Sequence, residues 1–262
     1  MEMYQFRTLF SFVKENIKYI LAVGFLYLVF LIANIPATVI LSAVNLPKNL
    51  SLTAISGTVW SGKAQQLNYM GISFGVVSWE LHPLNLLLGE LSADISITNN
   101  EQYINTEASI SSSGKIELEE TRFAIDVSSL QPLTYGMPFA YSGNATGYFP
   151  VSYFHKNNYV GVNGTLSLTA IGMVSPQQQP LGDFEINFQA EKEGATSGRI
   201  KDSDGPLNID GKLLLKKDGQ FTISAKLATA DTGSSLEQAL SLFGSKDSNG
   251  RVQFNSRFKL WH

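Results

Sequence analysis

One segment near the N-terminus constrains the fold of this chain more than any other. Residues Tyr19–Ile35 are almost entirely apolar, and no charged residue occurs between Lys18 and Lys48. A helix over Tyr19–Leu41 would be about 35 Å long, which is enough to cross the hydrocarbon core of a bilayer with some tilt. Pro36 is expected to kink or end this helix, because proline cannot donate the helical hydrogen bond. The segment therefore predicts a membrane span.

Two other interpretations of this segment are less favourable. A buried helix of a soluble protein would rarely be this long without a charge. A cleaved signal peptide would have a shorter apolar region with small residues before the cleavage site, whereas no Ala-x-Ala sequence follows the segment here. We therefore predict an uncleaved, single-pass anchor.

The residues before the span predict an interfacial helix and an orientation. The apolar positions Phe6, Leu9, Phe10, Val13 and Ile17 share one helical face, and the basic positions Arg7, Lys14 and Lys18 share another. Such a helix lies at a membrane surface, and basic residues favour the cytoplasmic side. The predicted division is a cytoplasmic or interfacial helix at 1–18, a transmembrane anchor at 19–41 and a periplasmic β-rich domain at 42–262 of a bacterial inner-membrane protein.

After Lys48 the dominant pattern is alternation of apolar and polar residues, which is typical of half-buried strands. It is found in Leu91–Ile97, Phe123–Val127, Phe184–Phe188, Phe221–Leu227 and Val252–Leu260. The pair Asp218-Gly219 between two such runs predicts a hairpin turn. The pattern indicates hairpin or meander units in a mostly antiparallel sheet.

Glycines and one helical segment complete the prediction. Strand-like runs are expected to open at Gly57, Gly89, Gly114, Gly164, Gly211 and Gly250. A short helix is expected over Ser234–Phe243, with Ser234 or Ser235 as its N-cap and Gly244 as its end. Pro176–Pro180 is expected to be a loop and a candidate joint within the domain.

The predicted fold class is mainly β, with a single N-terminal transmembrane helix, a curved and mostly antiparallel β-region, and one short C-terminal helix. That helix is too short to cover the apolar face of so many strands. The sheet must therefore curl or pair as a sandwich to close on itself, or leave an apolar groove partly open.

Composition argues against most catalytic chemistry. The net charge of −3 disfavours a nucleic-acid partner, and the absence of cysteine excludes disulfides and thiolate metal sites. The three histidines are scattered (His82, His155 and His262), and the acidic residues Glu117, Glu119 and Glu120 are interpreted as a solvated strand face. We predict no catalytic, cofactor-binding or metal-binding residue and no cofactor, so an enzyme is not expected.

Two tryptophan-containing motifs stand out from this background. The first is Gly57-Thr58-Val59-Trp60-Ser-Gly62, and the second runs from Trp79 through Pro83 and Leu87 to Gly89. Small residues on both sides of Trp60 allow the backbone to turn closely around the indole. The favoured interpretation is a structural packing motif at the start of the β-region rather than a ligand site.

These motifs, together with the short N-terminal segment and single span, resemble the type II secretion system protein N family. The resemblance implies a non-enzymatic, single-pass inner-membrane component that contacts other type II secretion components in assembly or scaffolding of the secretion platform. A wider similarity to AsmA-like envelope proteins implies an alternative, in which an apolar β-groove binds or moves lipid. Carried over, the family motif comprises Gly57, Thr58, Val59, Trp60, Gly62, Trp79, Pro83, Leu87 and Gly89, in a structural role.

Overall fold

The computed structural model describes residues 2–43, 46–134, 140–155, 159–175, 178–191, 194–229, 231 and 233–259. Its helices are α1 (Glu2–Ala33), α2 (Ala37–Ala43), the 3-10 helices η1 (Asn85–Leu88) and η2 (Val127–Thr134), and α3 (Ser235–Ser241). Its strands are β1 (Leu50–Gly57), β2 (Ser61–Tyr69), β3 (Ile72–Leu81), β4 (Glu90–Asn99), β5 (Gln102–Ser111), β6 (Lys115–Asp126), β7 (Ala140–His155), β8 (Tyr159–Ser175), β9 (Gln179–Ala190), β10 (Thr196–Asp204), β11 (Leu207–Leu215), β12 (Gln220–Thr229) and β13 (Val252–Lys259).

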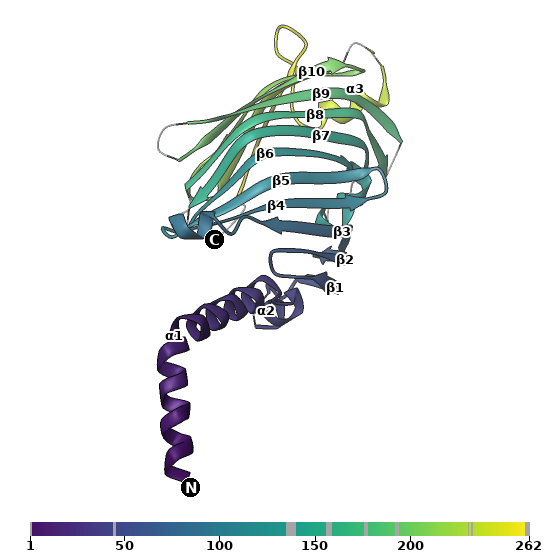
Figure 1. The fold of residues 1–262 in the computed structure, drawn as a ribbon. Helices are drawn as coiled ribbons and strands as arrows, with labels where there is room; N and C mark the ends of the chain where they lie inside the picture. The colour runs from purple at the N-terminus through teal and green to yellow at the C-terminus, as the bar shows by residue number, and fades with distance from the viewer. Residues whose placement is uncertain are drawn as a thin grey trace.

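The N-terminal helix α1 is bent: its first half points away from the sheet, and its second half runs below the β1 end of the sheet to α2 (Figure 1). Its portion Asn16–Ala33 is long and apolar enough to cross a membrane, and the rest of the chain does not bury it. The helix ends at Ala33, and α2 begins directly after Pro36. The helix predicted over 19–41 is therefore interrupted close to the proline that was expected to kink or end it.

All thirteen strands form one antiparallel sheet in which the order in space follows the order in sequence, from β1 to β13. The strands stack upward from β1 beside α2 and curve round as a shell (Figure 1). This confirms the mainly β, antiparallel and curved prediction. β8 and β9 pair directly on either side of the loop and joint expected at Pro176–Pro180, so the sheet continues past it. Residues 176 and 177 lie outside the described residues, and Gln179 and Pro180 already belong to β9.

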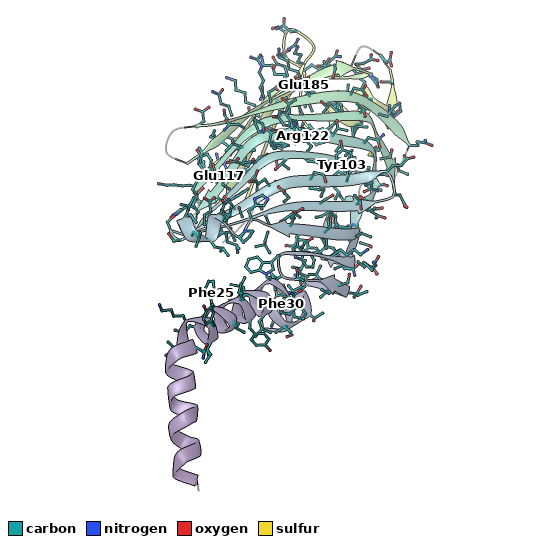
Figure 2. All side chains as sticks on the ribbon, in the orientation of Figure 1. Phe25, Phe30, Tyr103, Glu117, Arg122 and Glu185 are labelled. Carbon is teal, nitrogen blue, oxygen red and sulfur yellow. The ribbon has the colours of Figure 1, made fainter. Side chains whose placement is uncertain are left out.

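One face of the sheet is apolar from end to end. The pairing register places one residue of each strand in a single row, namely Ile55, Ala64, Val77, Ile97, Ile104, Phe123, Gly147, Leu166, Ile186, Ile200, Gly211, Ala225 and Phe254. Directly paired residues share a face, so this row crosses the whole inner surface. The opposite, outer face carries polar side chains such as Glu117, Arg122 and Glu185 (Figure 2).

The inner face is covered at one end and open at the other. Near the C-terminus, Leu240 of α3 packs with Ala225, Leu227 and Val252 in a buried cluster. The helix follows the prediction closely, because Ser234 is its N-cap and its side chain accepts a hydrogen bond from the backbone N–H of Glu237.

At the N-terminal end, by contrast, the apolar residues Leu91, Ile110 and Ile116 are exposed. Of the two predicted alternatives, a sheet closed on itself or a groove left partly open, the structure therefore shows a curled sheet with a partly open groove.

The expectation that glycines open strands is correct for Gly89, Gly114 and Gly250 and wrong for the other three. Gly57 ends β1, whereas Gly164 and Gly211 lie inside β8 and β11. At Gly211 an added Cβ would lie 2.6 Å from the Cβ of Ala225. This glycine is needed because the curled inner face is crowded, not because the chain turns there.

Candidate functional site

The first tryptophan motif forms the turn between β1 and β2 and contacts the end of α1. Gly57 has a φ of +92°, which favours glycine, and the N–H of Thr58 donates to the Ser61 carbonyl at 2.9 Å. The N–H of Val59 donates to the carbonyl of Ile35 at 2.9 Å, and Thr58 forms an isolated bridge with Pro36. The turn is therefore bonded to the segment that follows the apolar helix.

Two indole N–H groups complete this connection. The Nε1 of Trp60 donates to the carbonyl of Ile32 in α1 at 2.8 Å, and the Nε1 of Trp79 donates to the carbonyl of Val59 at 3.1 Å. The N–H of Leu81 donates to the carbonyl of Trp60 at 2.6 Å. We call the set Ile32, Ile35, Val59, Trp60 and Trp79 the Trp clasp, because it joins α1 to the first three strands.

Gly62 explains why the motif needs a glycine after Trp60. Gly62 pairs with Trp79 across β2 and β3. A Cβ at Gly62 would lie 2.5 Å from Cζ2 of the Trp79 indole and 2.8 Å from the Ser56 carbonyl oxygen. The indole therefore occupies the space that any larger residue would need. Trp60 itself is only half-buried, so its ring is part of the contact between α1 and the sheet and not of a hydrophobic core.

The second half of the predicted motif lies outside the clasp, apart from Trp79. Pro83 and Leu87 are in the connection between β3 and β4 that contains η1. Gly89 ends η1 in a left-handed conformation with a φ of 78°, and its N–H bonds to the carbonyl of Leu86 at 3.1 Å. The structure thus separates the predicted motif into the Trp clasp and a loop that carries exposed leucines.

An apolar cavity of about 500 Å³ lies on the inner face beside the clasp. Its lining comes from α2, from β1 to β5 and from the β1–β2 turn, and is apolar apart from Ser92. The lining includes Val59 and Trp79 of the clasp, together with Leu52, Ile97 and Ala108. The sequence analysis gave a partly open apolar groove as one alternative but not its position, because strand alternation predicts an apolar face and not where that face remains uncovered.

His82 lies in a hydrogen-bond network at the ends of β3 and β4. Its Nε2 is 3.1 Å from Oδ2 of Asp94, and its Nδ1 is 3.3 Å from Oγ of Ser92. Although these are the residue types of a hydrolytic triad, Ser92 is only 2% exposed and its Oγ accepts a hydrogen bond of 2.6 Å from Asn85. A serine oxygen held in this way cannot attack a substrate from solvent, so the network fits a structural role.

Two of the acidic residues of β6, Glu117 and Glu120, are paired with neighbours on the outer face. Lys115 Nζ is 2.6 Å from Glu117, and Arg122 is 2.7 Å from Glu120. The Tyr148 hydroxyl also donates to Glu120 at 2.9 Å. Contacts of this kind between partly exposed side chains agree with a solvated strand face and contribute little stability.

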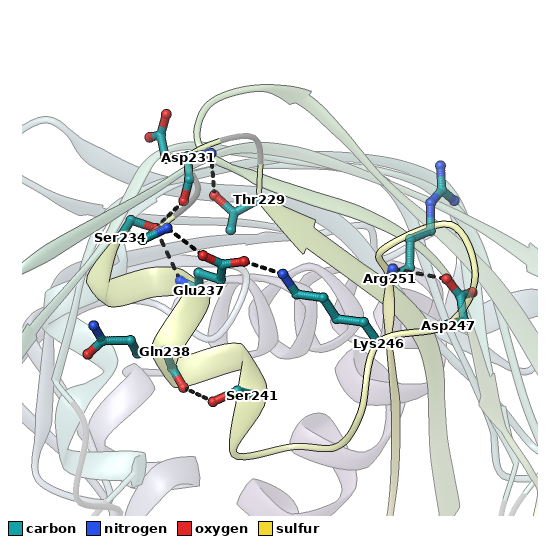
Figure 3. A network of polar contacts seen from close by, with 10 residues as sticks. Thr229, Asp231, Ser234, Glu237, Gln238, Ser241, Lys246, Asp247 and Arg251 are labelled. Carbon is teal, nitrogen blue, oxygen red and sulfur yellow. Dashed lines mark hydrogen bonds and ion pairs between the residues drawn. The ribbon is translucent and has the colours of Figure 1, made fainter.

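A polar network surrounds α3 at the other end of the sheet (Figure 3). Lys246 donates a hydrogen bond to Glu237, whose backbone N–H donates to the Ser234 side chain at 3.2 Å. The bond from Lys246 holds the pKa of the Glu237 carboxyl below its usual value. A backbone N–H bond from Arg251 likewise lowers the pKa of Asp247. These contacts stabilise the cap that covers the C-terminal part of the inner face.

Comparison with known proteins gives a consistent result over most of the chain. The sequence model of the family described as "Type II secretion system (T2SS), protein N" matches residues 48–255. Proteins named "Type II secretion system protein N" are similar to the chain in three organisms: Vibrio cholerae (27% identity, covering 94% of this chain and all of the relative), Aeromonas hydrophila (25%, covering 89% and 95%) and Klebsiella pneumoniae (23%, covering 91% and 94%). No solved structure matches the chain significantly.

Proposed function

The chain belongs to the type II secretion system protein N family, and from that premise we propose that it is a non-enzymatic, inner-membrane component that helps to assemble the secretion platform. In this proposal the segment Asn16–Ala33 crosses the membrane once, with the N-terminus in the cytoplasm and the sheet in the periplasm. The basic residues Arg7, Lys14 and Lys18 before the span support this orientation.

The observation that carries the proposal is the Trp clasp. It bonds the end of α1 to the β1–β2 turn through Ile32 and Ile35, and to β3 through Trp79. A sheet held in this way cannot swing freely on the anchor, so it keeps a fixed height and direction above the membrane. Within the described residues, the edge strand β13 pairs with β12 and otherwise only through a single bridge from Val252 to Lys246. The rest of its outer edge then offers backbone groups to another envelope protein, which is the geometry of β-augmentation.

A secretion assay tests the scaffolding role. In cells that lack their own copy, the full chain should restore secretion, whereas Trp60→Ala should reduce it at equal protein level. Tyr69→Ala is the matched control, because Tyr69 is an exposed aromatic at the other end of β2. A photo-crosslinking residue at Gln253 on β13 should capture another secretion component. Full secretion by Trp60→Ala, or no crosslink from β13, would contradict the proposal.

The apolar cavity supports a second candidate function, which is binding or moving lipid along the groove. A volume of about 500 Å³ with an almost wholly apolar lining is within the range of small-molecule sites. Ala108→Trp would fill the cavity, whereas Ser109→Trp would place the same ring on the opposite face. Loss of co-purified lipid and of secretion in Ala108→Trp alone would favour this function. Equal behaviour of the two variants, with no lipid in the unmodified chain, would exclude it.

A further inference from the structure

The connection between β3 and β4 exposes a cluster of leucines that the clasp does not use. Leu84, Leu87 and Leu88 are 74%, 84% and 83% exposed, and they surround the single turn of η1. Gly89 makes this possible, because its left-handed conformation turns the chain directly from η1 into β4. Three large apolar side chains so exposed on one short turn form a contiguous apolar surface rather than scattered exposure.

A short path of hydrogen bonds and chain links this leucine cluster to the end of the apolar helix. The backbone N–H of Leu81 donates to the carbonyl of Trp60, and the indole Nε1 of Trp60 donates to the carbonyl of Ile32, one residue before α1 ends. Only His82 to Leu84 separate Leu81 from η1, and four residue steps of extended chain reach at most about 14 Å. Figure 1 accordingly draws the β3–β4 connection on the side of the sheet that faces α1.

The apolar helix fixes the height of the membrane surface relative to this cluster. Asn16–Ala33 has 18 residues and is therefore about 27 Å long, close to the thickness of the hydrocarbon core. Its C-terminal end then lies at the hydrocarbon boundary, with Trp60 at the depth where tryptophans concentrate in membrane proteins. The interfacial layer extends about 5–7 Å beyond that boundary, so side chains of the β3–β4 connection can reach it.

We propose that Leu84, Leu87 and Leu88 form a second membrane contact that inserts into the phospholipid surface from the periplasmic side. The proposal rests on the membrane span of the proposed function and adds a second point of attachment. The span and the leucine cluster together would fix the tilt of the sheet, which one helix alone cannot do. A bilayer fits the cluster better than a protein partner, because protein hot spots favour Trp, Tyr and Arg, and leucine is under-represented there.

The absence of cysteine in the chain makes a direct depth measurement possible. Three single-cysteine variants of the full chain, Leu87→Cys, Phe25→Cys and Leu242→Cys, are labelled with an environment-sensitive fluorophore. They are reconstituted into vesicles of phosphatidylethanolamine and phosphatidylglycerol that contain lipid-attached quenchers. Phe25 lies in the span (Figure 2), and Leu242 is the matched control because it is an 86% exposed leucine beside α3.

We expect the labels at Leu87 and Phe25 to lose most of their emission to the lipid quencher and the label at Leu242 to keep its emission. Quenching at Phe25 without quenching at Leu87 would overturn the second contact while leaving the span intact, and would assign the cluster to a protein partner instead. Equal quenching at Leu242 would also overturn it, because the whole sheet would then lie on the membrane. No quenching at Phe25 would contradict the membrane span itself.

Discussion

Replacing Gly62 with alanine tests the packing of the Trp clasp directly. The added Cβ would lie 2.5 Å from Cζ2 of Trp79 and 2.8 Å from the Ser56 carbonyl oxygen, so the indole must move. Overpacking of this kind costs about 1–3 kcal/mol. The displaced indole also weakens its 3.1 Å hydrogen bond to the Val59 carbonyl, which adds about 0.5–1.5 kcal/mol. A gain of about 0.4–1 kcal/mol from the stiffer unfolded chain offsets part of this loss.

We therefore expect Gly62→Ala to lower the free energy of unfolding by about 1–3 kcal/mol. The assay is urea unfolding of the full chain in detergent micelles. Unfolding is monitored by the β-sheet signal in far-ultraviolet circular dichroism. Gly172→Ala is the matched control in β8, because the nearest atom to an added Cβ there would be 3.4 Å away, which is an ordinary contact. The control should be unchanged or up to about 1 kcal/mol more stable.

A double-mutant cycle identifies the cause of the loss. Trp79→Leu removes the six-membered ring that the new Cβ would meet, so Gly62→Ala should cost much less in that background. The expected coupling energy is about 1–2 kcal/mol, within the range for residues in contact. Equal stability of Gly62→Ala and Gly172→Ala, or strict additivity in the cycle, would refute the packing argument.

Three further predictions concern the clasp and the C-terminal cap. Trp60→Phe keeps an aromatic ring but removes the hydrogen bond to the Ile32 carbonyl, so the local stability of the β1–β2 turn should fall by about 1 kcal/mol. Amide hydrogen exchange in this turn should therefore become faster, and an unchanged exchange rate would contradict the bond. Ser234→Ala removes the N-cap of α3 and should lower the free energy of unfolding by about 1 kcal/mol, whereas Ser241→Ala should have little effect. The pKa of the Glu237 carboxyl is lower in the folded chain than in the unfolded chain. The ionised carboxylate therefore stabilises the fold at a pH above the unfolded-state pKa, and this stabilisation is lost as the pH falls through the folded-state pKa. Unfolding measured below about pH 4 should therefore be less acid-sensitive in Glu237→Gln, and an identical pH profile would contradict the assignment.

The local elements of the fold could be predicted from the sequence because their causes are local. Alternation placed β4, β9 and β12, Asp218-Gly219 placed the hairpin before β12, and Ser234 placed the start of α3. The apolar helix was also predictable, since its length and lack of charge appear in the sequence itself.

The curvature of the sheet and the role of the tryptophans could not be predicted in the same way. Curvature depends on register shifts, such as the one between β5 and β6 near Glu120, which has a φ of 49°. A bulge of this kind changes which residues face inward without changing the alternation elsewhere. The bond from Trp60 to Ile32 joins residues 28 positions apart, and nothing in the pattern around either one indicates the other.

We infer that the Trp clasp holds the sheet in one orientation on α1. The most direct test is a distance measurement by electron paramagnetic resonance between nitroxides at Phe25→Cys in α1 and Glu101→Cys in the β4–β5 turn, with the full chain in lipid nanodiscs. We expect a single narrow distance distribution, which broadens when Trp60→Ala is added. A distribution that is already broad with Trp60 present, or one that Trp60→Ala leaves unchanged, would contradict the claim.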